Sequence, residues 1–201
     1  MPRLLLATGN LHKQEELKSL LRGLPYEMVT PSELSIDDRV EENGCTLEEN
    51  ATLKATTFAA RSGILSLADD SGLEVDALDG APGVFSSRYA GENASDADRV
   101  NFLLSKLKGV PAEKRGAKFR CVIAIASPQG KIELCIGECK GVIALAPGGK
   151  EGFGYDPVFY LPQLGKTMAE LPPAQKNEIS HRARATAEAR HLLINIANAQ
   201  Y

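Results

Sequence analysis

The sequence predicts an α/β protein in which a mixed β-sheet is flanked by helices. Strand-then-helix units open the chain, and a hairpin of two strands lies in its middle. Parallel strands need a crossover, usually a helix, whereas a hairpin joins antiparallel neighbours, so a sheet that holds both kinds of pair is mixed. With 201 residues, of which 43% are hydrophobic, the chain is expected to form one domain with room for two lobes.

The first third of the chain alternates apolar runs with helical patterns. The expected elements are a strand over 3–7, a helix over 11–22, a strand over 26–29, an acidic loop over 31–45 and a helix over 46–62. Thr46 and Glu49 have the spacing of a capping box at the start of the second helix, and Gly63 is suited to end it.

The rest of the chain continues the sheet and adds two helices. The expected strands are 64–68, 73–75, 119–126, 131–139 with a continuation over 141–146, and 157–161; the expected helices are 95–107 and 180–199. Ser95 and Asp98 indicate the start of the first of these helices. The Ser-Pro-Gln-Gly segment at 127–130 is typical of a hairpin turn.

Charge and composition exclude several classes of protein. The net charge of −3 gives no basic footprint, so no nucleic-acid polymer is expected as a partner. The four cysteines lack CxxC spacing and are expected to be small buried side chains in a reducing cytoplasm. The apolar runs are too short for a signal peptide or for a membrane span of about 18 residues, so no membrane is expected as a partner.

An apolar run from Ile64 to Ala68 leads into two adjacent carboxylates, Asp69 and Asp70. The pattern predicts a buried strand that carries charge to its exposed end, where α/β proteins bind ligands. Neighbouring carboxylates repel each other, so such a pair commonly holds a cation or accepts a proton. A polar surface turn is the alternative. In an extended chain the two side chains point to opposite sides, which leaves the role of Asp69 open.

Residues 8–13 combine a small-residue turn with the start of a helix. Unpaired amides at a helix N-terminus bind phosphate, Gly9 allows close backbone approach, and Lys13 adds a full charge. The alternative is that Asn10 simply caps the helix beside a solvated lysine.

The acidic segment Glu41–Gly44 precedes the second helix. One of its two glutamates could complete a cation site with Asp70, because Mg²⁺ on a triphosphate takes only one or two protein carboxylates. A solvated acidic loop is the alternative. Lys54, further along the helix, could face the same site or lie on the surface.

Two C-terminal segments carry the remaining candidates. Residues 148–154 contain four glycines, and Phe153 and Tyr155 either offer ring faces to a base or anchor the loop in the core. His181 and Arg182 fall in the first turn of the last helix, where cations are disfavoured. That conflict indicates that they are held for the oxygens of a ligand; a partly buried His beside a solvated Arg is the alternative.

In this order and spacing, the motifs resemble those of the inosine/xanthosine triphosphate pyrophosphatase family, from residue 4 to about residue 195. The ordered set is far more specific than any single member. The matching motifs are Thr8-Gly9-Asn10-x-x-Lys13, Glu49-Asn50-Ala51-x-x-Lys54-Ala55, Ala68-Asp69-Asp70-Ser71-Gly72-Leu73, Gly80-Ala81-Pro82-Gly83, Ser87-Arg88-Tyr89, Gly152-Phe153-Gly154-Tyr155-Asp156-Pro157 and Ser180-His181-Arg182.

The resemblance implies a long mixed sheet in two lobes with a central cleft, in one pyrophosphatase domain over residues 1–201. It implies a cytoplasmic, homodimeric hydrolase that cleaves the purine nucleoside triphosphates ITP, dITP and XTP at the α–β phosphate bond. It also implies Mg²⁺ held by Glu41 and Asp70, with Asp70 as proton acceptor for the attacking water. The implied substrate contacts are Thr8, Gly9, Asn10, Leu11, His12, Lys13 and Ser71 at the triphosphate, and Phe153, Gly154, Tyr155, Asp156, Lys176, His181 and Arg182 at base and sugar.

Base selectivity has a physical hypothesis. Hypoxanthine and xanthine carry an oxygen at C6, where adenine carries an amino group. A donor such as Arg182 or His181 could bond that oxygen, and adenine would then place donor against donor in a closed pocket. Two rivals to the function stay open: a nucleotide-binding sensor without turnover, and a pyrophosphatase for modified pyrimidine triphosphates.

Overall fold

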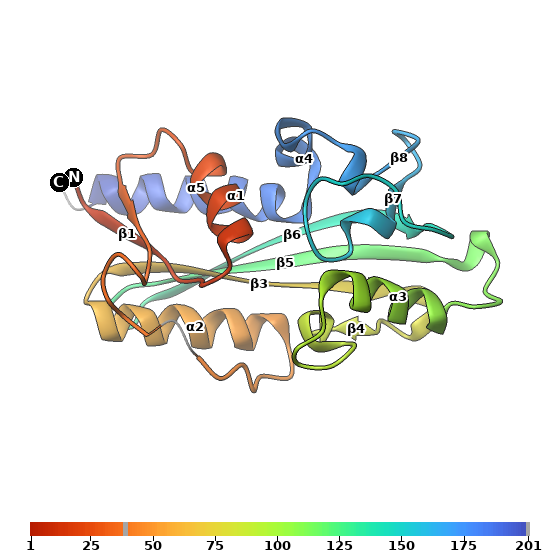
Figure 1. Cartoon of the computed structure of the whole chain (residues 1–201). Helices are drawn as coiled ribbons and strands as arrows, with labels where there is room; N and C mark the ends of the chain where they lie inside the picture. The colour runs from red at the N-terminus through yellow and green to blue at the C-terminus, as the bar shows by residue number, and fades with distance from the viewer. Residues whose placement is uncertain (38–39, 200–201) are drawn as a thin grey trace. The chain divides into compact units, whose positions relative to one another are not determined.

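The computed structural model describes residues 1–37 and 40–199 (Figure 1). In chain order the elements are β1 (Arg3–Leu6), α1 (Leu11–Leu20), β2 (Glu27–Val29), α2 (Leu47–Ser62), β3 (Leu65–Val75), β4 (Pro82–Gly83), α3 (Asp96–Lys106), β5 (Gly116–Ala126), β6 (Ile132–Ile143), β7 (Phe159–Leu161), β8 (Lys166–Thr167), α4 (Pro173–Ile179) and α5 (His181–Ala199). Short 3₁₀ turns lie between several of them.

The predicted mixed sheet is confirmed. Within the described residues the strands follow the hydrogen-bonded order β2-β1-β3-β5-β6-β7-β8, and β4 pairs with β3. β1 runs parallel to both β2 and β3, whereas β7 runs antiparallel to β6 and β8. The parallel part contains the strand-helix units, in which α1 connects β1 to β2 and α2 connects β2 to β3.

The chain divides into two compact units, to both of which β3, β5 and β6 contribute residues. Unit 1 draws on Met1–Asp70, Cys121–Gly137 and Arg182–Tyr201, and unit 2 on Ser71–Arg120 and Glu138–His181. Two units agree with the expectation of two lobes, and each has its own hydrophobic core. The central cleft stays a prediction.

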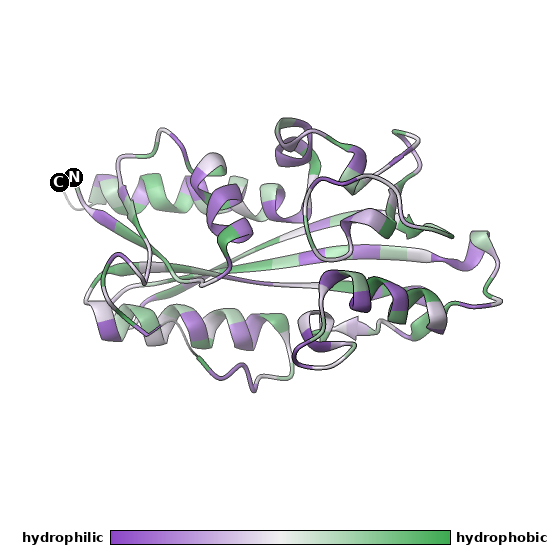
Figure 2. Ribbon diagram, viewed as in Figure 1, coloured by the Kyte–Doolittle hydropathy of each residue, from purple (hydrophilic) through white to green (hydrophobic). Residues whose placement is uncertain are grey.

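In unit 1, α1 and α5 cover one face of the sheet and α2 covers the other (Figure 1). Apolar and polar residues alternate along α2 and α5, as expected for helices with one face on a core (Figure 2). The core packs leucines of β1, α1 and β3 against small residues of α5, namely Leu4, Leu6, Leu17, Leu67, Ala185 and Ala189. Cys121 and Cys135 lie in this core and Cys139 in that of unit 2, so the expectation of buried cysteines is confirmed for these three, whereas Cys45 is exposed.

In unit 2, aromatic and aliphatic side chains from α3, the sheet and the 3₁₀ turn before β7 form the second core, including Leu103, Phe119, Val158 and Phe159. The predicted start of α3 is confirmed, because Ser95 and Asp98 bond reciprocally in a capping box.

The ends of α2 in unit 1 are also as predicted, with Thr46 accepting from the Glu49 amide and Gly63 in the left-handed conformation at φ +67°.

The structure corrects the expectation that a strand ends at Asp69 and Asp70. β3 runs without a break through both carboxylates to Val75, so they lie in the middle of the strand, and both are buried. Lys13, Lys54 and Arg182, which come from three helices, neutralise the two carboxylates. The charged part of the strand can therefore be buried. Position 72 requires a glycine because β4 passes close to the strand there. A Cβ at this position would lie 2.4 Å from the Gly83 carbonyl oxygen.

Other differences lie in short elements. α4, β4 and β8 have no counterpart among the predicted elements, and β7 begins at Phe159 because residues 156–158 form a 3₁₀ turn. The two prolines that open α4 occupy its N-cap and first position, where a missing amide hydrogen costs nothing, although they resemble a loop in sequence. In the described part of the chain, the helices are all too short or too polar to cross a membrane.

Candidate active site

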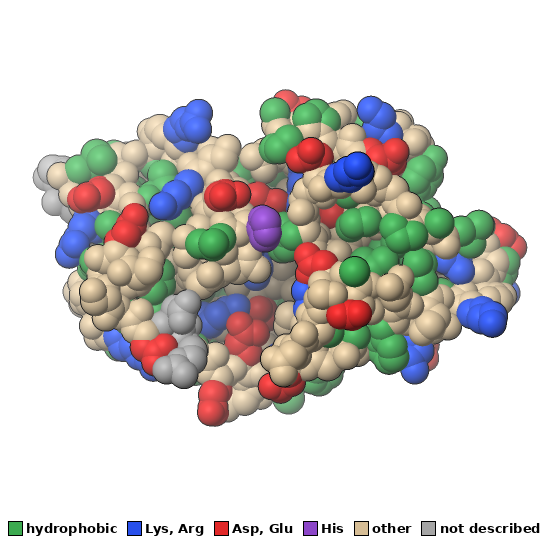
Figure 3. Space-filling model, viewed as in Figure 1, with side chains coloured by type: hydrophobic (Ala, Val, Ile, Leu, Met, Phe, Trp, Pro, Cys, Tyr) green, Lys and Arg blue, Asp and Glu red, His purple; other side chains and the backbone are tan. Residues whose placement is uncertain are grey.

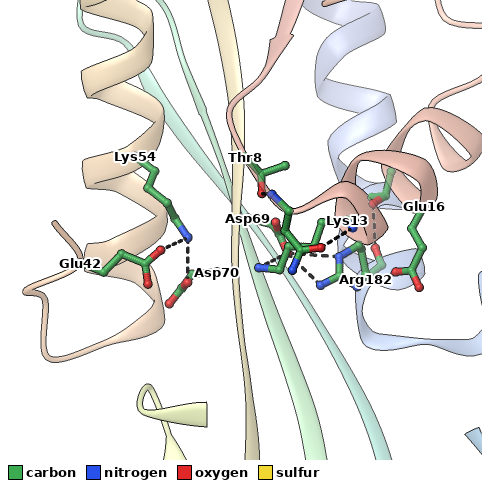
Figure 4. A network of polar contacts seen from close by, with 10 residues as sticks. Thr8, Lys13, Glu16, Glu42, Lys54, Asp69, Asp70 and Arg182 are labelled. Carbon is green, nitrogen blue, oxygen red and sulfur yellow. Dashed lines mark hydrogen bonds and ion pairs between the residues drawn. The ribbon is translucent and has the colours of Figure 1, made fainter. Parts of the chain in front are cut away.

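Asp69 and Asp70 lie on opposite faces of β3, and each face presents its own cluster of charges (Figure 4). Asp69 points toward α1 and α5, and Asp70 points toward α2. This division follows from the alternation of side chains along a strand, as expected for an extended pair. All the charged residues in the two clusters belong to unit 1.

Asp69 is the fully buried centre of the first cluster. Its Oδ2 accepts from Arg182 Nε at 3.1 Å and Nη2 at 3.0 Å, and lies 3.1 Å from Lys13 Nζ. Arg182 Nη1 also donates to Glu16 at 2.6 Å. Burial by itself would raise the pKa of Asp69, but Lys13 and Arg182 outweigh it and hold the pKa well below its usual range. Asp69 is therefore a permanent anion that holds two cations in place.

The place of Arg182 differs from the selectivity hypothesis. Its side chain is 1% exposed, and its guanidinium donates to Asp69 and Glu16. The pKa of Arg182 is raised: burial opposes the charge, but the two carboxylates outweigh it. In this arrangement Arg182 orders the buried cluster, and a direct contact with a base stays a prediction. The alternative of a solvated arginine is wrong.

Asp70 belongs to the second cluster. Lys54 Nζ of α2 donates to Asp70 Oδ1 at 2.8 Å and to Glu42 Oε1 at 3.0 Å. Burial raises the pKa of Asp70, and Lys54 offsets only part of that effect. Burial lowers and the carboxylates raise the pKa of Lys54, with a net increase. Asp70 is thus the more easily protonated of the two neighbouring aspartates.

The acidic loop, defined as Glu41–Gly44, reaches this second cluster through Glu42. The Glu42 side chain is half-buried against Lys54, whereas Glu41 is exposed. Glu41 is therefore the neighbour in sequence of Glu42, which binds the same lysine, Lys54, as Asp70 does. The sequence left the place of Lys54 open, and the structure puts it between two carboxylates, with 10% of its side chain exposed.

The start of α1 presents the predicted phosphate-binding segment. Asn10 accepts from the Lys13 amide at 3.2 Å, and Gln14 Nε2 donates to the Thr8 carbonyl at 2.7 Å, which fixes the turn. The cap that the alternative proposed is thus real, but Lys13 is held by Asp69 instead of being solvated. The remaining residues of the segment are exposed, namely Gly9, Asn10, Leu11 and His12.

Apart from Arg182, the predicted base and sugar residues lie in unit 2, which has a buried carboxylate of its own in Asp156. Asp156 Oδ2 accepts from Lys176 Nζ at 2.6 Å and from the Phe153 amide at 2.9 Å. Lys176 Nζ also lies 4.8 Å from the centre of the Phe153 ring, which is half-buried. Asp156 therefore sets the positions of both a cation and an aromatic face. Ser71, the other substrate residue of this unit, is half-buried.

Tyr155 and His181 are more buried than Phe153. The Tyr155 hydroxyl donates to the Ser86 carbonyl at 2.9 Å, so this ring anchors the glycine-rich loop, the second of the two roles considered for it. The His181 ring stacks on Phe119 at 4.7 Å between centroids. Gly154, between the two aromatic residues of the loop, donates its amide to Asp96 Oδ2 at 2.6 Å.

Sequence reasoning missed Glu16 and Asp96. Glu16 lies three residues after Lys13 on one helix face, and this spacing could have suggested a shared charge cluster. Asp96 lies 58 residues from Gly154, and nothing local to either residue indicates the hydrogen bond.

Comparisons with known proteins identify the family of this chain. The chain matches the Ham1 family over residues 4–192. The chain belongs to the Ham1 family. It is 52% identical to a dITP/XTP pyrophosphatase of Geobacter sulfurreducens over 93% of this chain and 94% of the relative. It is 50% identical to a dITP/XTP pyrophosphatase of Desulforamulus reducens over 95% of each chain.

Solved Ham1 structures have the same fold. A HAM1 protein from Coxiella burnetii superimposes with a TM-score of 0.89 at 44% identity, covering 97% of this chain and 100% of the other. The Staphylococcus aureus Ham1 protein gives a TM-score of 0.85 at 43% identity, covering 95% and 97%. The family resemblance and the fold class predicted from the sequence are confirmed.

Proposed function

We propose that this Ham1 protein is a Mg²⁺-dependent pyrophosphatase of non-standard purine nucleoside triphosphates, with dITP, ITP and XTP as substrates. It releases the nucleoside monophosphate and pyrophosphate and so clears these nucleotides from the pool. One observation carries the proposal: Asp70, a buried carboxylate of raised pKa, is bonded to Lys54 in a chain closely similar to dITP/XTP pyrophosphatases.

The triphosphate would bind at the start of α1. Residues 9–12 are exposed at the N-terminus of α1, which carries a partial positive charge, and Lys13 adds a full charge. Acidic and basic side chains are interspersed over the face shown in Figure 3, so this face has no broad positive surface that would attract a polyphosphate. Binding therefore depends on positive charge gathered at one place, such as the start of α1. Asp69, itself held by Arg182, keeps Lys13 in place, and a prepositioned lysine loses little freedom on binding.

The chemistry of the residues fits Mg²⁺. In the described part of the chain, no group of three or more His, Cys, Asp and Glu side chains is arranged to hold a metal ion alone. Mg²⁺ bound to a triphosphate needs only one or two protein carboxylates, because phosphate oxygens and waters complete its shell. We assign these carboxylates to Asp70 and Glu41, whereas Glu42 neutralises Lys54. Bound there, Mg²⁺ would neutralise charge on the phosphates.

Asp70 is the proton acceptor in this proposal. A carboxylate whose pKa is raised by burial takes a proton from water more readily than an ordinary aspartate does. Lys54, bonded to the same side chain, holds Asp70 in one orientation and lies ready to stabilise charge on the phosphate. No covalent intermediate is required, since the water attacks the phosphorus directly.

The base and sugar are assigned to unit 2. Phe153 offers a half-buried ring with Lys176 over it, and Asp156 holds both. His181, the second donor of the selectivity hypothesis, is buried against Phe119. A donor at C6 oxygen would favour hypoxanthine and xanthine over adenine. In this proposal the two units serve one catalytic domain over residues 1–201.

Homodimerisation and a cytoplasmic location are part of the proposal. Ile132, Leu134 and Ile136 alternate along β6 and are 40%, 40% and 44% exposed, an apolar stripe suited to a second copy. Burial raises the pKa of the Cys135 thiol to about 12, which keeps it protonated and inert as suits a reducing compartment. Light scattering during gel filtration gives the oligomeric state directly.

Pyrophosphate release tests the function. The substrates are dITP, ITP, XTP, ATP, GTP and a modified pyrimidine triphosphate, each with Mg²⁺ and with EDTA. We expect Mg²⁺-dependent release that favours dITP, ITP and XTP over ATP and GTP by about 100-fold, as one lost polar contact can produce. Binding without any release would identify a sensor, and a preference for the pyrimidine would identify the rival enzyme.

A further inference from the structure

We propose that Asn50 is a positioning residue that clamps the acidic loop Glu41–Gly44 onto α2 and so sets the place of the loop glutamates relative to Asp70. The proposal rests on the proposed function, in which a loop glutamate and Asp70 hold Mg²⁺. All the residues concerned lie in unit 1.

The clamp is a single buried hydrogen bond. Asn50 Oδ1 accepts from the Gly44 backbone amide at 2.9 Å, and Asn50 is completely buried. Because Oδ1 faces an N–H donor, the orientation of the Asn50 amide group is determined by this bond. A second tether joins the Cys45 amide to Glu49 at 2.6 Å, but it is exposed, and water can replace it. Asn50 is therefore the buried tether of the loop backbone, whereas Lys54 holds the loop through the Glu42 side chain.

The other half of the Asn50 amide makes the residue costly in the helix. Asn50 Nδ2 is shielded from solvent and makes no hydrogen bond with residues 1–37 or 40–199. Buried donors are almost always paired, and alanine is a better helix former than asparagine. Asn50 costs stability through its unpaired donor and through its low helix propensity. We explain its presence by the Gly44 amide, which Asn50 Oδ1 holds in place.

The helix geometry links the clamp to the catalytic cluster. Asn50 and Lys54 are four residues apart, on one face of α2. Asn50 holds Gly44, two residues after Glu42, while Lys54 binds both Glu42 and Asp70. One face of α2 thus holds the loop at two points, the Gly44 backbone amide and the Glu42 carboxylate. Loss of the anchor would let the glutamates move relative to Asp70.

Gly44 fits the clamp from the other side. A Cβ at position 44 would lie 2.7 Å from both Asn50 Oδ1 and Glu49 Cβ, closer than any real contact of this kind. Gly44→Ala therefore pushes the loop off Asn50 without changing Asn50 itself. Asn50→Ala and Gly44→Ala break the same contact from opposite sides, so their effects should not add.

Two measurements on the full-length protein test the clamp. The first is hydrogen–deuterium exchange of the peptide over residues 41–46, without nucleotide. The second is the Mg²⁺ concentration for half-maximal dITP hydrolysis. The control is Asn43→Ala, which removes an exposed amide side chain from the same loop. Thermal unfolding of each variant confirms that it is folded.

We expect Asn50→Ala and Gly44→Ala each to speed exchange at Gly44 and to raise the half-saturating Mg²⁺ concentration by about tenfold, the loss that one buried hydrogen bond produces. At saturating Mg²⁺, kcat should largely recover, and the double variant should resemble either single variant. Asn43→Ala should match the wild type in both measurements.

Unchanged exchange in both folded variants would overturn the clamp, and so would a fall in kcat with no shift in the Mg²⁺ requirement. A wild-type protein that releases no pyrophosphate would overturn the proposed function instead. The exchange measurement needs no activity, so it separates failure of the clamp from failure of the function.

Discussion

The two faces of β3 show how neighbouring aspartates acquire opposite properties. Asp69 contacts two cations, Lys13 and Arg182, and its pKa is held well below the usual range. Asp70 contacts one, Lys54, which it shares with Glu42, and its pKa is raised by burial. Both are buried, so burial alone does not decide the outcome. The number of cations that contact a carboxylate, and whether another carboxylate shares them, decides the direction of its pKa shift. Asp69 is thereby kept as an anion, and Asp70 accepts a proton more readily.

Removing the carboxylate of Asp70 should have the largest effect on activity. Asp70→Asn keeps the shape of the side chain but cannot accept a proton from water, so kcat for dITP should fall about 10³-fold, as for loss of a general base. Thermal unfolding should change little, because Lys54 keeps Glu42 as its partner. An Asp70→Asn variant that is folded and retains a tenth of the wild-type kcat would assign the proton to another group.

Asp69→Asn should instead act on stability. It leaves Arg182 and Lys13 without their shared carboxylate, so the free energy of unfolding at pH 7 should fall by about 3 kcal/mol. Because the pKa of Asp69 is lower in the folded state than in the unfolded state, its stabilising effect is present above the unfolded pKa and is lost as the pH falls toward the folded pKa.

The difference in unfolding free energy between wild type and Asp69→Asn should therefore shrink below about pH 4. Urea unfolding at a series of pH values measures it. A difference that stays constant from pH 7 to pH 3 would show that Asp69 is not held as an anion by the folded protein.

The sequence was sufficient to predict the mixed sheet and the limits of α2, because capping patterns and apolar periodicity are local. It did not predict that β3 continues through Asp69, since the compensating Arg182 is 113 residues away. For the same reason the buried ion pair of Arg182 with Asp69 has no local signal in the sequence. The anchoring role of Tyr155 depends on the carbonyl of Ser86, 69 residues distant.

The two loop glutamates offer a matched test on the Asp70 face. If Glu41 binds Mg²⁺ and Glu42 neutralises Lys54, Glu41→Gln should raise the half-saturating Mg²⁺ concentration about tenfold, an order typical of losing one ligand contact. Glu42→Gln should shift it much less. Mg²⁺ titration of dITP hydrolysis compares the two, and the reverse ranking would transfer the metal ligand to Glu42.

A smaller effect is expected in unit 2, to which we assign the base instead of the phosphates. Lys176→Met removes the cation over Phe153 but keeps an apolar side chain beside the ring. We expect KM for dITP to rise about fivefold with kcat nearly unchanged, in line with a cation–π contact of about 1 kcal/mol. Steady-state kinetics measure this split, and a fall in kcat alone would place Lys176 at the reacting phosphate.

The central difference between the two aspartates is measured most directly by ¹³C NMR titration of their carboxyl carbons in the metal-free protein, with the two Asn variants used for assignment. The account predicts that the Asp69 signal stays at its deprotonated position from pH 7.5 to pH 3.5, while Asp70 titrates with a midpoint above the ordinary value of 3.8. Two carboxyls that titrate together near 3.8 would contradict it.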